Sequence, residues 1–195
     1  MTYKPVLDIV PSHPIEPFEE WRIQRGRVHG VEHRMSMWQF PKREWNVTWT
    51  NKPNSVMNAL RNFFNGIDGP LSSFFFREPV ITSRAHVRIG EGDGYQRTWV
   101  FPATGYAFHA TFVNSSEMAQ GVDYDILPGA AQNGFDILSF RSAVTSGSVV
   151  WCNYTDGYFL PIVRAASPFS PSIGAILIGS VDMTLRETME DYPDS

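Results

Sequence analysis

The densest group of residues able to do chemistry is His29, Glu32, His33 and Arg34. We predict a strand from Val28 to Met37, on which His29 and His33 point to one side and Glu32 and Arg34 to the other. At about 3.3 Å per residue the two histidines are roughly 13 Å apart, too far to bind one metal ion. We interpret the segment as a solvated or interface surface, in which Glu32 and Arg34 pair with each other or with a neighbouring subunit.

Three other patterns resemble reactive sites only superficially. Gly90-Glu91-Gly92-Asp93-Gly94 lacks the spacing and the following helix of a phosphate-binding loop, so we predict a hairpin or flexible loop. The carboxylate pairs Glu19-Glu20 and Asp123/Asp125 are typical of solvated edges, and a small hydrolase built on such a pair is a minor alternative. Cys152 lies in the apolar run VVWCNY, which favours a buried, inert thiol. We predict no enzyme activity, no cofactor and no metal.

Aromatic residues make up 14% of the chain. Trp45, Trp49, Trp99 and Tyr106 could form a stacking platform for a sugar, so a carbohydrate-binding β-sandwich for host attachment is the main alternative function. Core or subunit interface is the more common use of such residues.

The net charge and the apolar segments of the chain argue against nucleic acid and membranes as binding partners. The net charge of −4 argues against a protein that grips nucleic acid, which needs an excess of Lys and Arg. The N-terminus lacks the pattern of a signal peptide, and the longest late apolar run, Ile173 to Val181, is too short to span a bilayer. We expect a protein made in the cytoplasm that does not enter a membrane.

One amphipathic helix stands out, at about residues 54–66. Six apolar residues recur along one stripe of a 3.6-residue repeat: Val56, Met57, Leu60, Phe63, Phe64 and Ile67. We expect Asn54 or Ser55 to cap its start, and Gly66 and Gly69 with Pro70 to end it. The helix is expected to lie across a β-sheet, where each buried large side chain contributes about 1.5–3 kcal/mol.

The remaining chain predicts short strands. The alternation of Trp45, Val47 and Trp49 with polar residues is the clearest half-buried pattern, and Phe74, Phe75 and Phe76 predict a strand buried on both faces. Asp156-Gly157 predicts a two-residue hairpin turn. Further strands are expected at 21–24, 96–101, 109–113, 122–126, 135–140, 149–154, 158–163 and 173–185, with a turn at Arg25-Gly26-Arg27.

These elements predict a mainly β (α+β) fold, a β-sandwich or barrel with one flanking helix. Residues 1–20, with four prolines, are expected to form an extended arm that frays or lies along a neighbouring subunit. Residues 21–187 are expected to form a single domain, followed by an acidic tail at 188–195.

In order along the chain, several segments resemble the distal tail, or minor tail, proteins of long-tailed bacteriophages and gene-transfer-agent particles. These are Gly30-Val31-Glu32-His33-Arg34 followed by Trp38, the aromatic strand from Arg43 to Trp49, and the helix ending Phe63-Phe64 with Gly66 or Gly69. The strand Phe74-Phe75-Phe76-Arg77-Glu78-Pro79 follows, and Phe159-Leu160-Pro161-Ile162-Val163-Arg164 echoes a late motif with one inserted residue. The order of the motifs carries the resemblance, which covers about residues 28–185.

The resemblance implies a tail-tube-like β-sandwich that assembles at the tail tip as a ring, hexameric in the family. Its partners would be copies of itself, the tail tube protein and the baseplate hub or fibre proteins, with DNA passing through the lumen and the virion as its location. A tube or tail-terminator role stays open. The candidates for a structural or interface role are Glu32, Arg34, Trp38, Arg43, Phe63, Phe64, Phe76 and Arg77.

Overall fold

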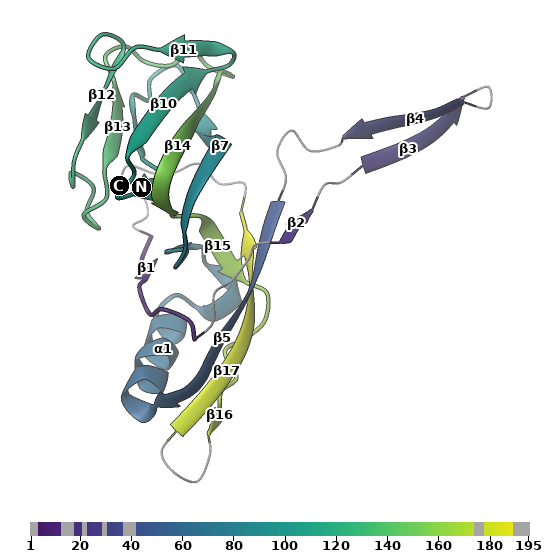
Figure 1. Cartoon of the computed structure of the whole chain (residues 1–195), viewed down its shortest axis with the longest axis vertical. Coiled ribbons are helices and arrows are strands. Elements are labelled where there is room, and N and C mark those ends of the chain that lie inside the picture. Colours follow the sequence, from purple (N-terminus) through teal and green to yellow (C-terminus); the bar gives the residue numbers. More distant parts are fainter. Residues whose placement is uncertain are drawn as a thin grey trace.

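The computed structural model describes residues 4–12, 18–20, 23–28, 31–36, 42–173 and 178–188. They form two lobes and a projecting hairpin (Figure 1). The lower lobe and the hairpin contain the following elements: β1 (Val6–Leu7), β2 (Phe18–Glu20), β3 (Ile23–Val28), β4 (Val31–Ser36), β5 (Lys42–Pro53), α1 (Asn54–Gly66), η1 (Gly69–Leu71), β6 (Phe74–Phe76), β15 (Ile162–Ala165), β16 (Ser172–Ile173) and β17 (Ile178–Glu187). The predicted mainly β class with one flanking α-helix is confirmed.

The upper lobe is built from the middle of the chain. Its strands are β7 (Ile81–Glu91), β8 (Thr98–Val100), β9 (Ala103–Thr104), β10 (Phe108–Val113), β11 (Ser116–Met118), β12 (Tyr124–Leu127), β13 (Ile137–Phe140) and β14 (Val149–Phe159). One sheet has the order β11-β10-β14-β7 with β9 also paired to β14, and a second has the order β12-β13-β8.

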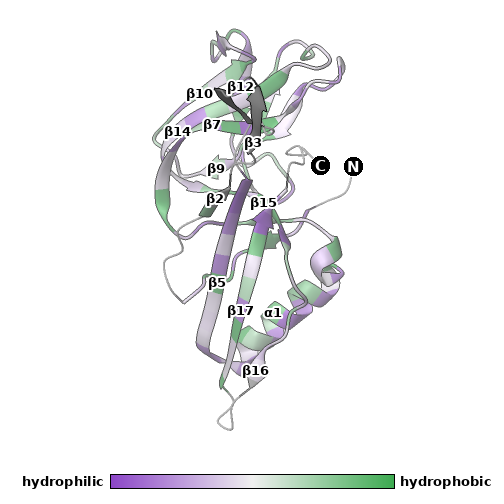
Figure 2. Ribbon diagram, turned by 90° about the vertical axis from the view of Figure 1, so that its right-hand side faces the viewer, coloured by the Kyte–Doolittle hydropathy of each residue, from purple (hydrophilic) through white to green (hydrophobic). Residues whose placement is uncertain are grey.

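The lower lobe is a sheet in the order β1-β6-β15-β17-β5-β2, with β16 on β17. Trp45, Val47 and Trp49 on β5 are buried, as the alternation predicts, and they lie opposite Leu185, Met183 and Val181 on β17. Helix α1 packs along this long strand pair (Figure 2). At the closest approach, a Cβ added to Gly179 would lie 2.8 Å from Cγ of Met57.

The helix has the predicted bounds, but its ends differ from the prediction. Met57, Leu60, Phe64 and Ile67 are buried, and Val56 and Phe63 pack partly buried against the core. Capping by Asn54 or Ser55 is wrong, because the N-cap residue is the extended Pro53 and no side chain caps the helix. Gly66 is the last helical residue, and the left-handed residues that turn the chain are Asp68 and Gly69, with φ of 55° and 59°.

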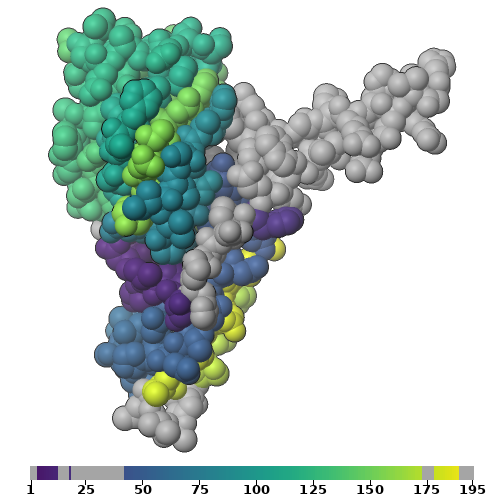
Figure 3. All heavy atoms as spheres, viewed as in Figure 1, coloured from purple at the N-terminus to yellow at the C-terminus, as the bar shows by residue number. Residues whose placement is uncertain are grey.

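The N-terminal segment lies within its own chain. β1 pairs in parallel with β6, and the Phe75 N–H donates to the Pro5 carbonyl at 2.9 Å. Further along, the Trp49 indole donates to the Ile9 carbonyl at 3.1 Å. In Figure 3 these residues, in purple, fill the space between the helix and the upper lobe. Residues 4–12 therefore pack against their own chain, and contact of the predicted arm at 1–20 with a neighbouring subunit stays a prediction.

Tertiary pairing overrides two turn predictions. The hairpin at Asp156-Gly157 is wrong because β14 runs straight through it, held between β10, β7 and β9. Asp156 does adopt the positive φ typical of such a turn, 53°, but it forms a bulge where the pairing with β7 shifts register. Arg25-Gly26-Arg27 is likewise not a turn, because all three lie inside β3.

Other strand boundaries also differ. The single late strand at 173–185 is instead an antiparallel pair, β16 and β17. Strand β7 was not expected at all: positive φ at His86 interrupts its alternation, and its end contains Gly90, which belongs to the predicted loop. The strand predicted at 21–24 overlaps β3 only at its end, and residues 21 and 22 lie outside the described part of the chain.

A continuous core joins the lobes. It includes α1, the three phenylalanines of β6, which are buried as predicted, and residues of both upper sheets. Two features stand out among the described residues: the junction between the lobes and the projecting hairpin.

Candidate functional site

The hairpin of β3 and β4 contains two of the predicted interface residues, Glu32 and Arg34. Six residue pairs join the two strands in antiparallel register, from Ile23–Ser36 to Val28–Val31. They form a two-stranded sheet of their own, and no other described strand pairs with them. Figure 1 shows the hairpin standing clear of both lobes. An isolated two-stranded hairpin is marginally stable in water, which favours a partner.

Trp38, which follows Glu32 and Arg34 in the set of predicted residues, lies outside the described residues. His29 and Gly30, between β3 and β4, also lie outside them. The predicted separation of His29 from His33 therefore stays a prediction. The backbone register does place Glu32 opposite Arg27, so the nearest cross-strand partner of Glu32 is an arginine that sequence reasoning did not single out.

Arg43 belongs to an ion pair at the base of the lower sheet. Its backbone N–H donates to Glu187 Oε2 at 3.1 Å, and its guanidinium Nη1 lies 3.3 Å from Oε1. The two side chains are 9% and 13% exposed, so water screens the pair little. Burial raises the pKa of the Glu187 carboxyl to about 7, although the Arg43 charge and hydrogen bonds oppose that shift.

A second buried ion pair lies beside the first. Arg84 Nη2 donates to both carboxylate oxygens of Glu78, at 3.0 and 2.7 Å, and the Trp45 indole donates to Oε1 at 3.3 Å. Glu78 is 1% exposed. These donors meet the hydrogen-bonding capacity of the buried Glu78 carboxylate within the chain, so we interpret Glu78 as a structural residue.

Phe159 joins the two ion pairs. The guanidinium carbon of Arg84 lies 4.6 Å from the centre of its ring, and that of Arg43 lies 5.4 Å away. Arg84 comes from the upper lobe and Arg43 from the lower lobe, so the ring is contacted by a cation from each. We call Arg43, Glu187, Glu78, Arg84 and Phe159 the junction cluster. Its geometry fixes the lobes relative to each other.

The other predicted interface residues do not gather at one place. Phe64 and Phe76 are buried in the core, where Phe76 contacts Trp45 edge-on at 6.1 Å. Phe63 contacts Phe64 and Phe74 edge-on, at 5.4 and 5.3 Å. Phe64 and Phe76 therefore pack inside this chain as structural residues, and a role at an interface between chains stays a prediction.

Arg77 is exposed, in contrast to its three phenylalanine neighbours. Its guanidinium carbon lies 4.7 Å from the centre of the Tyr158 ring. The pair borders a hollow of about 260 Å³ whose other walls are Pro79 and residues 7–10. Val10, 61% exposed, adds apolar surface there. Arg77 can therefore contact another molecule.

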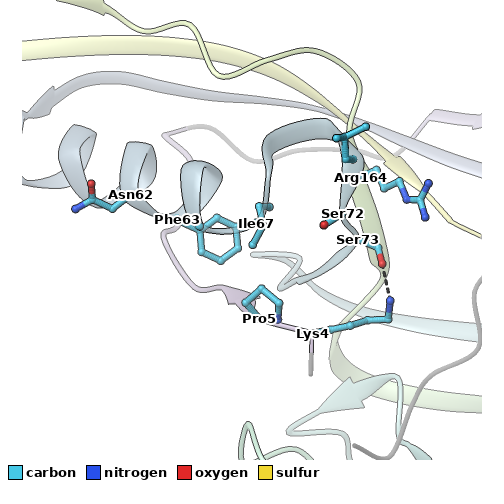
Figure 4. A pocket seen from close by; sticks show the side chains of 10 residues that line it. Lys4, Pro5, Asn62, Phe63, Ile67, Ser72, Ser73 and Arg164 are labelled. Atoms are coloured by element: carbon cyan, nitrogen blue, oxygen red, sulfur yellow. Dashed lines mark hydrogen bonds between the residues drawn. The ribbon is translucent and has the colours of Figure 1, made fainter. Parts of the chain in front are cut away.

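A larger hollow, of about 720 Å³, lies between the end of α1 and the N-terminal segment. Figure 4 shows Phe63 and Ile67 on its helical side, and Pro5 and Lys4 across from them. Lys4 Nζ donates to Ser73 Oγ at 2.5 Å, and Arg164 lies at the same end. The residues that line it combine apolar surface with two cations and the hydroxyls of Ser72 and Ser73.

The alternative sugar platform of Trp45, Trp49 or Trp99 is wrong, because all three are fully buried, as the more common use of such residues predicts. A different tryptophan lies at the surface of the upper sheet. Trp151 stacks between Phe112, with ring centres 4.1 Å apart, and His86, at 4.5 Å. The three rings come from β10, β14 and β7, and cross-strand neighbours of this kind stabilise a sheet. Their register was invisible in the sequence because β7 was not predicted.

Residues with reactive side chains occupy structural positions. Cys152 is buried, and burial raises its pKa, so the thiolate is disfavoured. Asp125 forms an exposed ion pair with Arg141 at 3.3 Å, and Asp123 accepts the Ala119 N–H at 2.8 Å. The Asp93 carboxylate accepts the N–H groups of Tyr95 and Gln96, which lowers its pKa and shapes the loop.

Within the described ranges, no three His, Cys, Asp or Glu side chains lie close enough to hold a metal ion. None of the helices described there is long and apolar enough to cross a bilayer.

No protein family model matches the chain, and no curated protein matches it.

Proposed function

We propose that this chain is a structural subunit of a bacteriophage tail tip, which closes with copies of itself into a ring. The ring, hexameric by resemblance to distal tail proteins, joins the tail tube to the baseplate hub or fibres and lets DNA pass. The observation that carries the proposal is the β3–β4 hairpin, a strand pair that extends from the body and shares no sheet with it.

The proposed mechanism is geometric. Exposed strand edges favour pairing with another chain, and a ring satisfies such edges by using the same contact at every subunit. The junction cluster supports this role, because a ring of defined diameter needs subunits whose two lobes keep a fixed angle. The net charge of −4 favours free passage of DNA, since an acidic wall repels phosphate.

Native mass spectrometry and negative-stain electron microscopy of the purified chain test the proposal. The matched variant lacks residues 23–36, which a short Gly-Ser linker replaces. We expect the native chain to form closed rings, and the variant to stay monomeric with an unchanged melting temperature, because the hairpin pairs with none of the other described strands. A chain that is monomeric at every concentration and absent from purified phage particles would refute the proposal.

The carbohydrate-binding alternative has little support. Its three named tryptophans are core residues, and the surface ring of Trp151 is covered on both faces by Phe112 and His86. A sugar stacks on an exposed ring face, and this arrangement leaves that tryptophan none.

A further inference from the structure

The projecting hairpin differs in charge from the rest of the chain. Residues 23–36 contain Arg25, Arg27 and Arg34 against one acid, Glu32, a net charge of +2. The whole chain carries −4, so the remainder carries −6. A basic hairpin on an acidic protein is electrostatically complementary to a second copy of the same protein.

The backbone register of the hairpin adds a second electrostatic argument for an acidic partner. Arg25 and Arg34 are directly opposite each other in the hairpin, so one cross-strand pair contains two positive charges. Like charges at such a position destabilise a hairpin by themselves, and an acidic partner from outside removes the penalty. The hairpin's own sequence thus favours an acidic contact.

An acidic surface lies on the other side of the upper lobe. Residues 98–140 contain no lysine or arginine but four acids, Glu117, Asp123, Asp125 and Asp136. Arg141 follows directly and pairs with Asp125 at 3.3 Å, so residues 98–141 carry a net charge of −3. Asp136 is engaged internally, accepting the Tyr106 hydroxyl at 2.8 Å, whereas Glu117 and Asp123 are exposed. Strand β12, which contains Asp125, is an edge strand at the left of Figure 1, and the hairpin projects to the right.

Apolar side chains flank those acids. Val122 is 69% exposed and Leu127 is 44% exposed, one just before β12 and one at its end. We call Glu117, Val122, Asp123, Asp125 and Leu127 the acidic edge. Exposed apolar residues bordered by charges are a common composition for a protein–protein contact.

We propose that the β3–β4 hairpin of one copy binds the acidic edge of the next copy, an inference that rests on the proposed ring. A contact between two different surfaces at opposite sides of a subunit is head-to-tail, and such contacts repeat around an axis until they close. This assigns the donor and acceptor surfaces of the ring, and it predicts that assembly weakens with salt, because exposed charges are screened.

Charge reversal with mixing tests the assignment. Arg34→Glu replaces the like-charged pair of the hairpin with an opposite pair, so it favours the hairpin's own fold while reducing its net charge to zero. We expect it to weaken assembly in sedimentation velocity by about tenfold or more. The double variants Arg25→Glu/Arg34→Glu and Glu117→Lys/Asp125→Lys should each stay monomeric alone, and an equimolar mixture should assemble.

The control is Asp182→Lys, an exposed charge reversal on β17 in the lower lobe, which should assemble normally. If the hairpin and edge variants assemble as the native chain does, or if the mixture stays monomeric, the assignment is wrong while the ring itself stands. If the native chain forms no ring at any salt concentration and is absent from particles, the proposed function fails, and the hairpin contact fails with it.

Discussion

Arg43 and Glu187 are 144 residues apart in the chain, yet the backbone N–H and the guanidinium of Arg43 both donate to the Glu187 carboxylate. The pair ties the start of β5 to the end of β17, and the Arg43 cation also contacts Phe159 from the upper lobe. One end of the β5–β17 strand pair and the junction between the lobes are therefore held by one contact.

Removing the cation should destabilise the fold. Arg43→Met keeps the apolar stem but leaves the Glu187 carboxylate buried without its charged partner. Breaking a buried pair in this way costs about 3–5 kcal/mol, and we expect the lower end because the carboxylate is partly solvated. Urea denaturation at pH 8 measures the loss. The control, Arg141→Met, breaks the exposed pair with Asp125 and should cost less than about 1 kcal/mol.

The raised pKa of the Glu187 carboxylate predicts that the folded chain loses stability as pH rises. Its pKa is about 7 in the folded chain against an ordinary value of 4.5, so the folded state binds the proton more tightly than the unfolded state. The free energy of unfolding should then fall as pH rises between about 4.5 and 7. Glu187→Gln should flatten that slope. An unchanged slope in this variant would show that other groups cause the pH dependence.

Sequence reasoning found the residues that follow a local period and missed those that depend on register. Val56 to Ile67 and the alternation of Trp45 to Trp49 report burial from spacing alone, so the helix and the best strand were predictable. Glu78, Arg84, Phe159 and Glu187 meet only because strands far apart in the chain pair side by side. No local pattern marks them.

The errors at turns have a related cause. Asp156-Gly157 has the backbone preference of a tight turn, and Asp156 adopts the expected positive φ. Whether that conformation reverses the chain or bulges a strand depends on the neighbours, and here three strands hold β14 straight. The sequence could not decide between a core and an interface position for Phe64 and Phe76, because exposed and buried aromatic residues look alike in a sequence, and the structure places both in the core.

Two glycines should respond oppositely to substitution. Gly66 is helical, and a Cβ there would contact nothing within 4 Å, so Gly66→Ala should stabilise the chain by about 0.4–1 kcal/mol. Gly179 is buried against Met57, so Gly179→Ala should destabilise it by about 1–3 kcal/mol. Thermal unfolding compares the two. In a Met57→Ala background, Gly179→Ala should cost less stability than it does in the native chain, because the smaller side chain at position 57 relieves the clash.

The single cysteine offers a probe of global opening. Cys152 lies in the middle of β14 with no exposed surface, and burial raises its pKa, so its thiolate is scarce and inaccessible in the folded chain. We expect a thiol reagent such as DTNB to react with the native chain only through its small unfolded population, and at once in urea. Arg43→Met should speed the reaction by a factor that matches its loss of stability, when opening and closing are fast relative to labelling. Rapid labelling of the native chain would mean that the upper sheets separate locally, without breaking the junction cluster.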